Sequence, residues 1–234
     1  DLAVIGGGSA GLTAAIMASI LGARVILLER DTLGDDCLRT GCVPSKALIA
    51  SGRAAHDARR ASTLGVDVSG VAPDFARVMD RVRAVQREIA THDSEEALAA
   101  HGVEVAFGAA RFIDPHHLRV AERTIEARRI IIATGASPSR PQIAGLDARA
   151  SVDHETIWKL DRRPARMVVL GGGPIGCELG QAFARLGTEV TIVERDPRIL
   201  SPFAAEAAEV VARAFDRDGI RVLTSHEALS VEDL

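Results

Sequence analysis

The sequence predicts an α/β protein built from two parallel-sheet domains, because one pattern of strand, glycine-rich turn, helix and strand occurs twice. The pattern begins at residue 2 and again at residue 167, and each time the second strand ends on a glutamate. Two cysteines, Cys37 and Cys42, lie between the copies. With 234 residues, of which 47% are hydrophobic and 26% charged, the chain is typical of an ordered globular protein of one large or two small domains.

The first copy is complete and in the expected order. It comprises a short apolar strand, a glycine turn, a helix stopped by a glycine, and a second strand that ends on an acid: residues 2–5, Gly6-x-Gly8-x-x-Gly11, residues 12–21 with Gly22, and residues 24–28 with Glu29. Such glycines allow a tight turn and bring backbone N–H groups to a pyrophosphate, while the acid binds a ribose. We interpret the unit as a Rossmann-like dinucleotide site.

The second copy repeats this order. Its parts are residues 167–170, Gly171-x-Gly173-x-x-Gly176, a helix over 178–186 stopped by Gly187, a strand over 190–193 and the acid Glu194. A further helix over 206–218 and a strand over 219–223 follow. Two independent copies, each with its acid, predict two bound dinucleotides.

The intervening segment changes period along its length. Residues 47–60 and 73–100 are predicted helices, the second with an apolar face of Phe75, Val78, Val82, Val85 and Ile89. Short strands joined by turns follow at 103–107, 118–120 and 124–126, with one turn at Asp114-Pro115, and a fully apolar strand covers 129–133. The linker that begins at Pro138 favours domains at 1–145 and 146–234.

Charge and cysteine usage exclude several classes of function. A net charge of −4 without a basic block argues against nucleic-acid and membrane partners. Three cysteines without a signal peptide indicate a reducing cytoplasm, where a close pair is redox-active or binds metal. A zinc site needs further ligands, and the nearest histidine in sequence is His56, so no metal site is predicted. Cys177 lies inside the second turn and is interpreted as a core residue.

Four motifs in this order carry a family resemblance. They are Gly6-x-Gly8-x-x-Gly11, Cys37-x4-Cys42-Val43-Pro44-Ser45-Lys46, Ala133-Thr134-Gly135 and Gly171-x-Gly173-x-x-Gly176-x-Glu178. Over essentially its whole length the chain resembles the flavin-dependent pyridine nucleotide–disulfide oxidoreductases. Val43 and the His92-Asp93-Ser94 run resemble the mercuric reductase-like branch most closely, with the dihydrolipoamide dehydrogenases beside it.

The resemblance implies two nucleotide cofactors, FAD and NAD(P)H. Residues that would contact FAD are Gly6, Gly8, Ser9, Ala10, Gly11, Glu29, Arg30, Asp36, Lys46, Thr134 and Gly135. Residues that would contact the nicotinamide nucleotide are Gly171, Gly173, Ile175, Gly176, Glu194 and Arg195. Glu194 favours NADH, because a carboxylate binds a ribose 2′-hydroxyl and repels a 2′-phosphate, although Arg195 stands where NADPH-using relatives carry an arginine.

The resemblance also implies the reaction. A hydride from NAD(P)H would pass through FAD to a Cys37–Cys42 disulfide and then to an acceptor, a disulfide substrate or a mercuric ion. Cys37 would be the thiol that attacks the substrate and Cys42 the thiol next to the flavin, with Lys46 paired to Glu178. Asp35 and Asp36 depart from the usual family sequence and are expected to raise the pKa of Cys37, partly offset by Arg39.

The family pattern extends past this sequence. The second domain is expected to be incomplete, and the C-terminal dimerisation domain with its acid–base histidine is expected to follow Leu234. The full-length protein is expected to be a homodimer, and this chain alone to be inactive. The alternatives are a lipoamide dehydrogenase, a soluble transhydrogenase that would not need the cysteines, and a non-catalytic nucleotide-binding or redox-sensing module.

Overall fold

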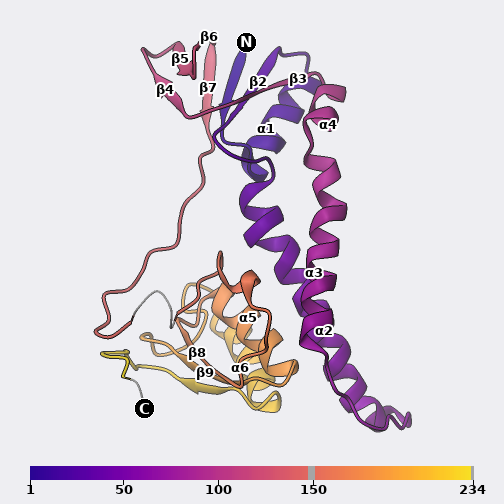
Figure 1. The fold of residues 1–234 in the computed structure, drawn as a ribbon. Helices are drawn as coiled ribbons and strands as arrows, with labels where there is room; N and C mark the ends of the chain where they lie inside the picture. The colour runs from indigo at the N-terminus through magenta and orange to yellow at the C-terminus, as the bar shows by residue number, and fades with distance from the viewer. Residues whose placement is uncertain (147–150, 233–234) are drawn as a thin grey trace. The chain divides into compact units, whose positions relative to one another are not determined.

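The computed structural model describes residues 1–146 and 151–232, with all their side chains except those of Asp35 and Asp36. It has the predicted α/β fold, with two parallel sheets and a separate small antiparallel sheet (Figure 1). Its contacts form two compact units, residues 1–43 with 84–138 and residues 44–83 with 139–234. The domain boundary near residue 145 stays a prediction.

The sheet of the first unit has four parallel strands in the order β3-β2-β1-β7. These strands are β1 (Leu2–Ile5), β2 (Val25–Glu29), β3 (Val103–Phe107) and β7 (Arg129–Ile132). Successive side chains of a strand point to opposite faces, so Val4 and Leu27 pack on one face beneath the helices α1 (Ser9–Ile20) and α4 (Glu95–Ala100). Leu12 and Leu98 are the buried partners that these two helices contribute.

The opposite face of this sheet is covered by an antiparallel meander. It consists of β4 (Ala110–Phe112), β5 (His117–Val120) and β6 (Arg123–Glu126), paired in that order. Leu118 and Val120 pack against Ala3 and Leu28 of the parallel sheet. The predicted turn before β5 is present, because Asp114 Oδ1 accepts hydrogen bonds from the backbone N–H groups of residues 116 and 117, at 2.8 and 2.9 Å.

The strand predicted over residues 103–107 is confirmed as β3, and it belongs to the main sheet, where it pairs parallel with β2. The strand β4 was not predicted. It is three residues long and largely exposed, so its sequence lacks the alternation of apolar and polar residues that marks a half-buried strand.

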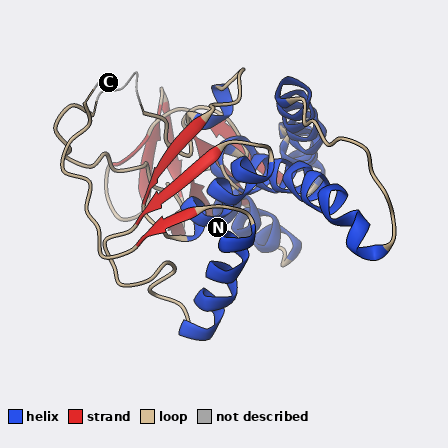
Figure 2. Cartoon of the chain, turned by 90° about the horizontal axis from the view of Figure 1, so that it is seen from below, coloured by secondary structure: helices blue, strands red, loops and turns tan. Residues whose placement is uncertain are grey.

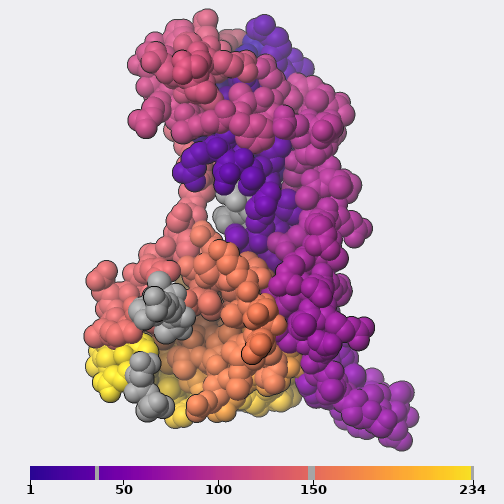
Figure 3. Space-filling view, viewed as in Figure 1, coloured from indigo at the N-terminus to yellow at the C-terminus, as the bar shows by residue number. Residues whose placement is uncertain are grey.

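The helix after the cysteines starts earlier than predicted. Residues 47–60 were expected, whereas α2 runs over Cys42–Arg60. Pro44 lies in its first turn, where the missing N–H leaves no intrahelical hydrogen bond unmade. Helix α2 ends in a short 3₁₀ turn, Ala61–Leu64, and the largely exposed residues 61–74 connect it along the surface to α3 (Figure 3).

The single helix predicted over 73–100 is broken in two. Helix α3 covers Phe75–Ala90, a 3₁₀ turn covers Thr91–Asp93, and α4 follows. The break occurs at Ser94, whose hydroxyl accepts a hydrogen bond from Ala97 N at 3.2 Å and caps the new helix. The buried face of α3 is Phe75, Met79 and Val82, so the prediction had missed Met79.

The second unit contains a three-stranded parallel sheet in the order β10-β9-β8. Its elements are β8 (Arg166–Leu170), α5 (Pro174–Arg185), β9 (Glu189–Val193), α6 (Ala205–Arg217) and β10 (Arg221–Leu223), with a 3₁₀ turn at Ile157–Lys159 before them. Figure 2 distinguishes the helices and strands of the chain by colour. Helix α5 begins at Pro174, four residues before the predicted start, because proline is favoured at the first helical position. Phe183 of α5 packs on Phe75 with ring centroids 5.8 Å apart.

Candidate functional site

The first glycine turn connects β1 to α1 in a backbone path that only glycine permits. Gly6 has φ +108°, and a Cβ added to it would overlap the carbonyl oxygen of Ala133. A Cβ added to Gly11 would overlap the carbonyl oxygen of Gly6 itself. These two glycines therefore let the turn close and let α1 approach β1.

The N-terminus of α1 is arranged for an anion. Gly8 occupies the cap position and no side chain caps the helix. The first-turn N–H groups, those of Ser9, Ala10 and Gly11, have no partner within a helix. A Cβ added to Gly8 would meet nothing within 4 Å, so a ligand can reach the backbone closely there. These features fit a pyrophosphate at the helix N-terminus.

Glu29 joins the end of β2 to this turn. One carboxylate oxygen accepts a hydrogen bond from Gly7 N at 2.6 Å, and the other accepts one from Asp31 N at 2.8 Å. The side chain is buried, with 7% of the residue exposed. Each oxygen keeps a second lone pair, so the expected bond to a ribose stays a prediction. Arg30 is exposed beside it.

The cysteine segment is attached to the same turn. Gly34 N donates a hydrogen bond to Gly7 O at 2.8 Å, and Gly34 takes the left-handed conformation, φ +76°. A π-helical turn over Asp35–Thr40 follows and carries Cys37. Turns of this rare type are frequent at functional sites. The side chain of Asp36, a predicted FAD contact, lies outside the described residues.

Gln86 supports the cysteine segment and was not predicted. Its amide nitrogen donates to the backbone oxygens of Leu38 and Arg39, at 3.1 and 2.8 Å. A polar residue next to the apolar stripe of α3, beside Val82 and Val85, was the available signal in the sequence.

The two cysteines differ in environment. Cys37 is half-buried and Cys42, the first residue of α2, is exposed. Within the described residues both are outside any disulfide. Burial raises the pKa of the Cys37 thiol, and the hydrogen bond and charge of Cys42 raise it further. The backbone N–H groups of Cys42 and Val43, which open α2, act in the opposite direction.

Lys46 forms an ion pair with its predicted partner. Its Nζ lies 2.6 Å from Glu178 Oε2 on α5, and the two side chains are 59% and 43% exposed. The pair lines a cavity of about 270 Å³ together with Ile49 and Gln181. Lys46 lies one helical turn after Cys42 on α2, on the same side of that helix.

The Thr134-Gly135 segment follows β7 directly against the first glycine turn. Ala133 N donates to Ile5 O at 2.8 Å, and an added Cβ on Gly6 would lie 3.2 Å from Thr134 N. Gly135 has φ +69°, a conformation that favours glycine. The structure therefore brings Thr134 to the glycine turn, and Gly135 follows it in sequence.

The second glycine turn has the same construction. Gly171 has φ +102°, and a Cβ added to Gly176 would overlap the carbonyl oxygen of Gly171. Glu194 accepts hydrogen bonds from Gly172 N at 2.6 Å and from Asp196 N at 2.7 Å. Helix α5 is capped by Gly173 without a side-chain bond, and Ile175 in its first turn is 53% exposed.

The two arginines after Glu194 have different surroundings. Arg195 is exposed. Arg198 donates to the backbone oxygens of Leu200, Ser201 and Phe203, at 2.9, 2.6 and 2.7 Å. Arg198 thus shapes the loop after β9, whereas Arg195 stays available to a nucleotide.

Cys177 is a core residue of the second turn. It is 5% exposed, and its Sγ donates to Gly172 O at 3.2 Å. Burial, with smaller effects of Glu194 and Glu178, raises the pKa of this thiol to about 11. A thiol of this kind is a poor nucleophile at neutral pH.

Comparisons with known proteins agree with this geometry. The family model described as pyridine nucleotide-disulphide oxidoreductase matches residues 1–234. The chain belongs to this family. A mercuric reductase from Lysinibacillus sphaericus is 35% identical over 95% of this chain and 41% of its own length. A mitochondrial dihydrolipoyl dehydrogenase from Schizosaccharomyces pombe is 37% identical over 99% of this chain and 47% of its own.

A solved structure of a relative has the same fold. The Cu(II) complex of the HOCl-induced flavoprotein disulfide reductase RclA from Escherichia coli matches with a TM-score of 0.81 and 26% identity, over 100% of this chain and 51% of that chain. The chain thus spans about half the length of the relatives that it matches. Within residues 1–146 and 151–232, every helix is too short or too polar to cross a lipid bilayer.

The residues present fit the FAD of this pyridine nucleotide–disulfide oxidoreductase family. The uncapped N-terminus of α1, the open space at Gly8 and the adjacent Thr134-Gly135 segment make a cradle for a pyrophosphate. In the described part of the chain, no group of three or more histidine, cysteine or acidic side chains is placed to hold a metal ion.

Proposed function

We propose that the full-length protein is an oxidoreductase that carries two electrons from NAD(P)H, by way of FAD, to a Cys37–Cys42 disulfide and then to an acceptor, which is a disulfide or a mercuric ion. The observation that supports this most is the attachment of the cysteine segment to the first glycine turn, by Gly34 N to Gly7 O. A cysteine pair attached to a dinucleotide-binding turn can exchange electrons with the dinucleotide that binds there.

FAD, when bound, supplies a two-electron carrier between the nicotinamide and the cysteines. Backbone N–H groups at Gly8 to Gly11 hold its pyrophosphate, and Glu29 keeps the turn in the binding conformation. The second turn holds the nicotinamide nucleotide in the same way. Reduction of the disulfide breaks the S–S bond with the two electrons of one hydride and one added proton, and yields two thiols.

Cys37 then attacks the substrate. Its pKa is raised by burial and by Cys42, so a base has to remove its proton before attack. The family resemblance assigns that base to a histidine of the dimerisation domain. The N–H groups of Cys42 and Val43 stabilise the thiolate once it forms.

The Lys46–Glu178 pair has a positioning role. Both side chains are about half exposed, so the pair adds on the order of 0–1 kcal/mol to stability. Its position one turn after Cys42 suits a cation that remains near the redox pair, held in place by Glu178.

We propose NADH as the preferred donor. Glu194, just after β9, is oriented by two backbone N–H groups. Arg198 is engaged by three carbonyl oxygens, so of the two nearby arginines only Arg195 is left to offset the charge of a 2′-phosphate. A carboxylate held in this position repels that phosphate. We expect a higher kcat/KM for NADH than for NADPH. A strong preference for NADPH would contradict this.

The decisive experiment counts thiols rather than turnover. The FAD-loaded full-length protein is treated without oxygen with one equivalent of NADH, denatured, and titrated for thiols. We expect a gain of two thiols, absent in Cys37→Ser and Cys42→Ser and present in the control Cys177→Ser. Oxidation of NADH without new thiols would favour the transhydrogenase alternative, which needs no cysteines.

The acceptor and the assembly need their own measurements. Rates with a mercuric salt and with lipoamide distinguish the two acceptor classes named for the relatives. We further propose a cytoplasmic homodimer, which light scattering of the full-length protein tests. A monomer in that measurement would contradict the proposed assembly without affecting the thiol result.

A further inference from the structure

The second unit contains an arginine-lined cavity that the proposed reaction does not use. It has a volume of about 380 Å³ and lies among the C-terminal ends of α2, α5 and α6. Four arginines and one carboxylate line it: Arg59, Arg60, Arg185, Arg217 and Asp218. The charge of its wall is therefore positive.

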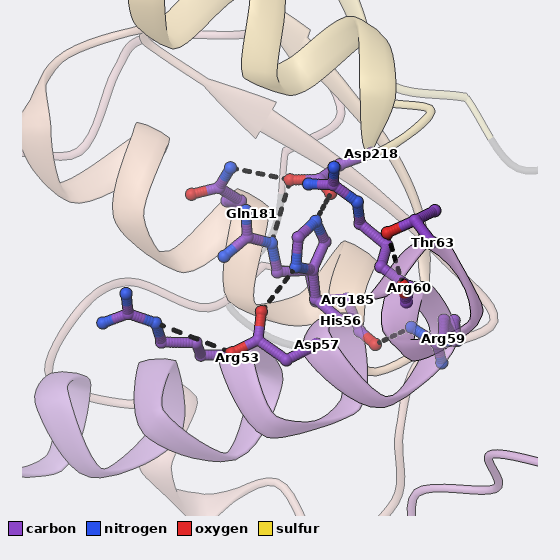
Figure 4. A network of polar contacts seen from close by, with 9 residues as sticks. All are labelled: Arg53, His56, Asp57, Arg59, Arg60, Thr63, Gln181, Arg185 and Asp218. Carbon is purple, nitrogen blue, oxygen red and sulfur yellow. Dashed lines mark hydrogen bonds and ion pairs between the residues drawn. The ribbon is translucent and has the colours of Figure 1, made fainter. Parts of the chain in front are cut away.

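A polar network of side chains fixes this wall (Figure 4). The Asp218 side chain is only 4% exposed, and its Oδ2 accepts from Arg185 Nε at 2.9 Å and from Gln181 Nε2 at 2.7 Å. His56 lies between two carboxylates, with Nδ1 3.0 Å from Asp57 Oδ1 and Nε2 3.6 Å from Asp218 Oδ1. These contacts hold α2, α5 and the end of α6 in one arrangement without a ligand.

Two of the four arginines are accounted for by ordinary structural roles. Arg59 donates to the carbonyl oxygen of Arg185 at 2.6 Å and so caps the end of α5. Arg185 is paired with Asp218. No carboxylate among residues 1–146 and 151–232, those of Asp35 and Asp36 aside, lies within ion-pair distance of Arg60 or Arg217. These two cations line a cavity whose frame is already fixed.

The cavity is separate from the nucleotide turn of the same unit. Arg185 is the last residue of α5, and the turn precedes its first residue, Pro174. At a rise of 1.5 Å per residue the two ends of this helix are about 16 Å apart. Dinucleotides bind at the carboxyl edge of the strands, and the cavity lies at the other end of the helix.

We propose that this cavity binds a small, multiply charged phosphate ester or diphosphate that lacks an aromatic base. Guanidinium groups recognise phosphate oxygens through paired hydrogen bonds, and Arg60 and Arg217 supply them from two different helices. The one ring among the described lining residues is that of His56, whose two nitrogens already face Asp57 and Asp218 at 3.0 and 3.6 Å, so no larger aromatic side chain offers a base a stacking surface. Occupation would join α2 to α6 more firmly and so act on the helix that carries Cys42.

Titration calorimetry of the FAD-loaded full-length protein with inorganic pyrophosphate, at constant ionic strength and saturating NAD⁺, tests this. We expect saturable binding that is at least about tenfold weaker in the double variant Arg60→Gln/Arg217→Gln, since each tenfold corresponds to about 1.4 kcal/mol. The matched control is Arg53→Gln/Arg213→Gln, which removes two arginines of the same helices that are outside the cavity lining and is expected to bind within about twofold of wild type.

Three binding results at saturating NAD⁺ would overturn the proposal, and a fourth result, obtained without NAD⁺, is given below. They are no saturable binding, an equal loss in both double variants, which indicates general charge screening, and tighter binding of AMP than of pyrophosphate. The visible spectrum of bound FAD and the thermal unfolding midpoint show that each variant is folded. Binding seen only without NAD⁺ would place pyrophosphate at the nucleotide turn and would also overturn it.

Discussion

The two glycine turns of this chain share one construction and differ in how they are enclosed. In each, a glutamate at the end of the second strand accepts a hydrogen bond at 2.6 Å from the glycine that follows the first motif glycine, Gly7 or Gly172, and its other oxygen accepts from the N–H group two residues after the glutamate. In each, a Cβ added to the third motif glycine would overlap the carbonyl oxygen of the first. This repeated arrangement is a property of the motif, and it fixes the turn before any nucleotide binds.

The differences lie around that common arrangement. Gly6 is covered by Ala133, whereas a Cβ added to Gly171 would meet nothing within 4 Å. The first helix begins with Ser9, which has an N–H group, and the second with Pro174, which has none. The first turn therefore offers a ligand one more backbone N–H donor, and it is packed against Ala133 where the second turn is open. We infer that it is built for a resident dinucleotide, FAD, and the second for one that exchanges, NAD(P)H.

The largest expected effects come from the third glycines. In Gly11→Ala, the new Cβ overlaps Gly6 O, and FAD affinity falls at least about a hundredfold; in Gly176→Ala, the same happens to NADH. Each change should leave the other nucleotide bound, as measured by retained FAD absorbance and by NADH titration. Full FAD content in Gly11→Ala would break the comparison.

A smaller but unequal pair of effects is expected at the first glycines. Gly6→Ala combines a positive φ with an overlap on Ala133 O and should destabilise by about 3–4 kcal/mol. Gly171→Ala has the positive φ alone and should cost about 1–2 kcal/mol. Urea unfolding of both variants measures the difference. Equal losses of stability in the two variants would show that Ala133 moves to accommodate the new methyl group at residue 6.

Replacing the two glutamates should change stability by amounts that differ less than those of the first glycines. Glutamine keeps the shape of each side chain but turns an N–H donor toward a backbone N–H, so one charge-assisted bond is lost. We expect Glu29→Gln, at a buried site, to cost about 2–3 kcal/mol and Glu194→Gln, at a half-buried site, about 1–2 kcal/mol. Only Glu194→Gln should also raise NADPH relative to NADH in kcat/KM. An unchanged ratio would remove Glu194 from donor choice.

Local pattern allowed most of this site to be predicted. Both turns, both acids, the cysteine pair and the Lys46–Glu178 partner came from motifs or resemblance, because each depends on residues at fixed spacing. Features that depend on residues far apart in the sequence could not be predicted in this way. They are the pairing of β3 with β2, the hydrogen bonds from Gln86, and the Asp218 network, whose members are up to 162 positions apart. The break at Ser94 was readable as a cap but was obscured by the continuous apolar period.

The smallest effect is expected at Cys177, which follows the third glycine of the second turn as Leu12 follows that of the first. Both are buried against the sheet, with 5% and 7% exposed. Cys177→Ala should therefore cost about 1 kcal/mol and leave NADH affinity unchanged, because the residue packs the helix and has no part in binding. Urea unfolding and NADH titration check both statements.

The pH dependence of this thiol gives a sharper test of the same assignment. Burial raises its pKa from 9.0 to about 11, so the folded state holds the proton more tightly than the unfolded state does. The stability that comes from the neutral thiol is complete below about pH 9 and is lost as pH rises through about 11. Native protein at pH 8 should alkylate slowly at Cys177, in contrast to the exposed Cys42, and Cys177→Ala should show a smaller loss of stability between pH 9 and 11 than wild type. Alkylation of Cys177 as fast as that of Cys42 would mean that the second glycine turn opens to solvent. The two turns would then differ in mobility as well as in how they are covered.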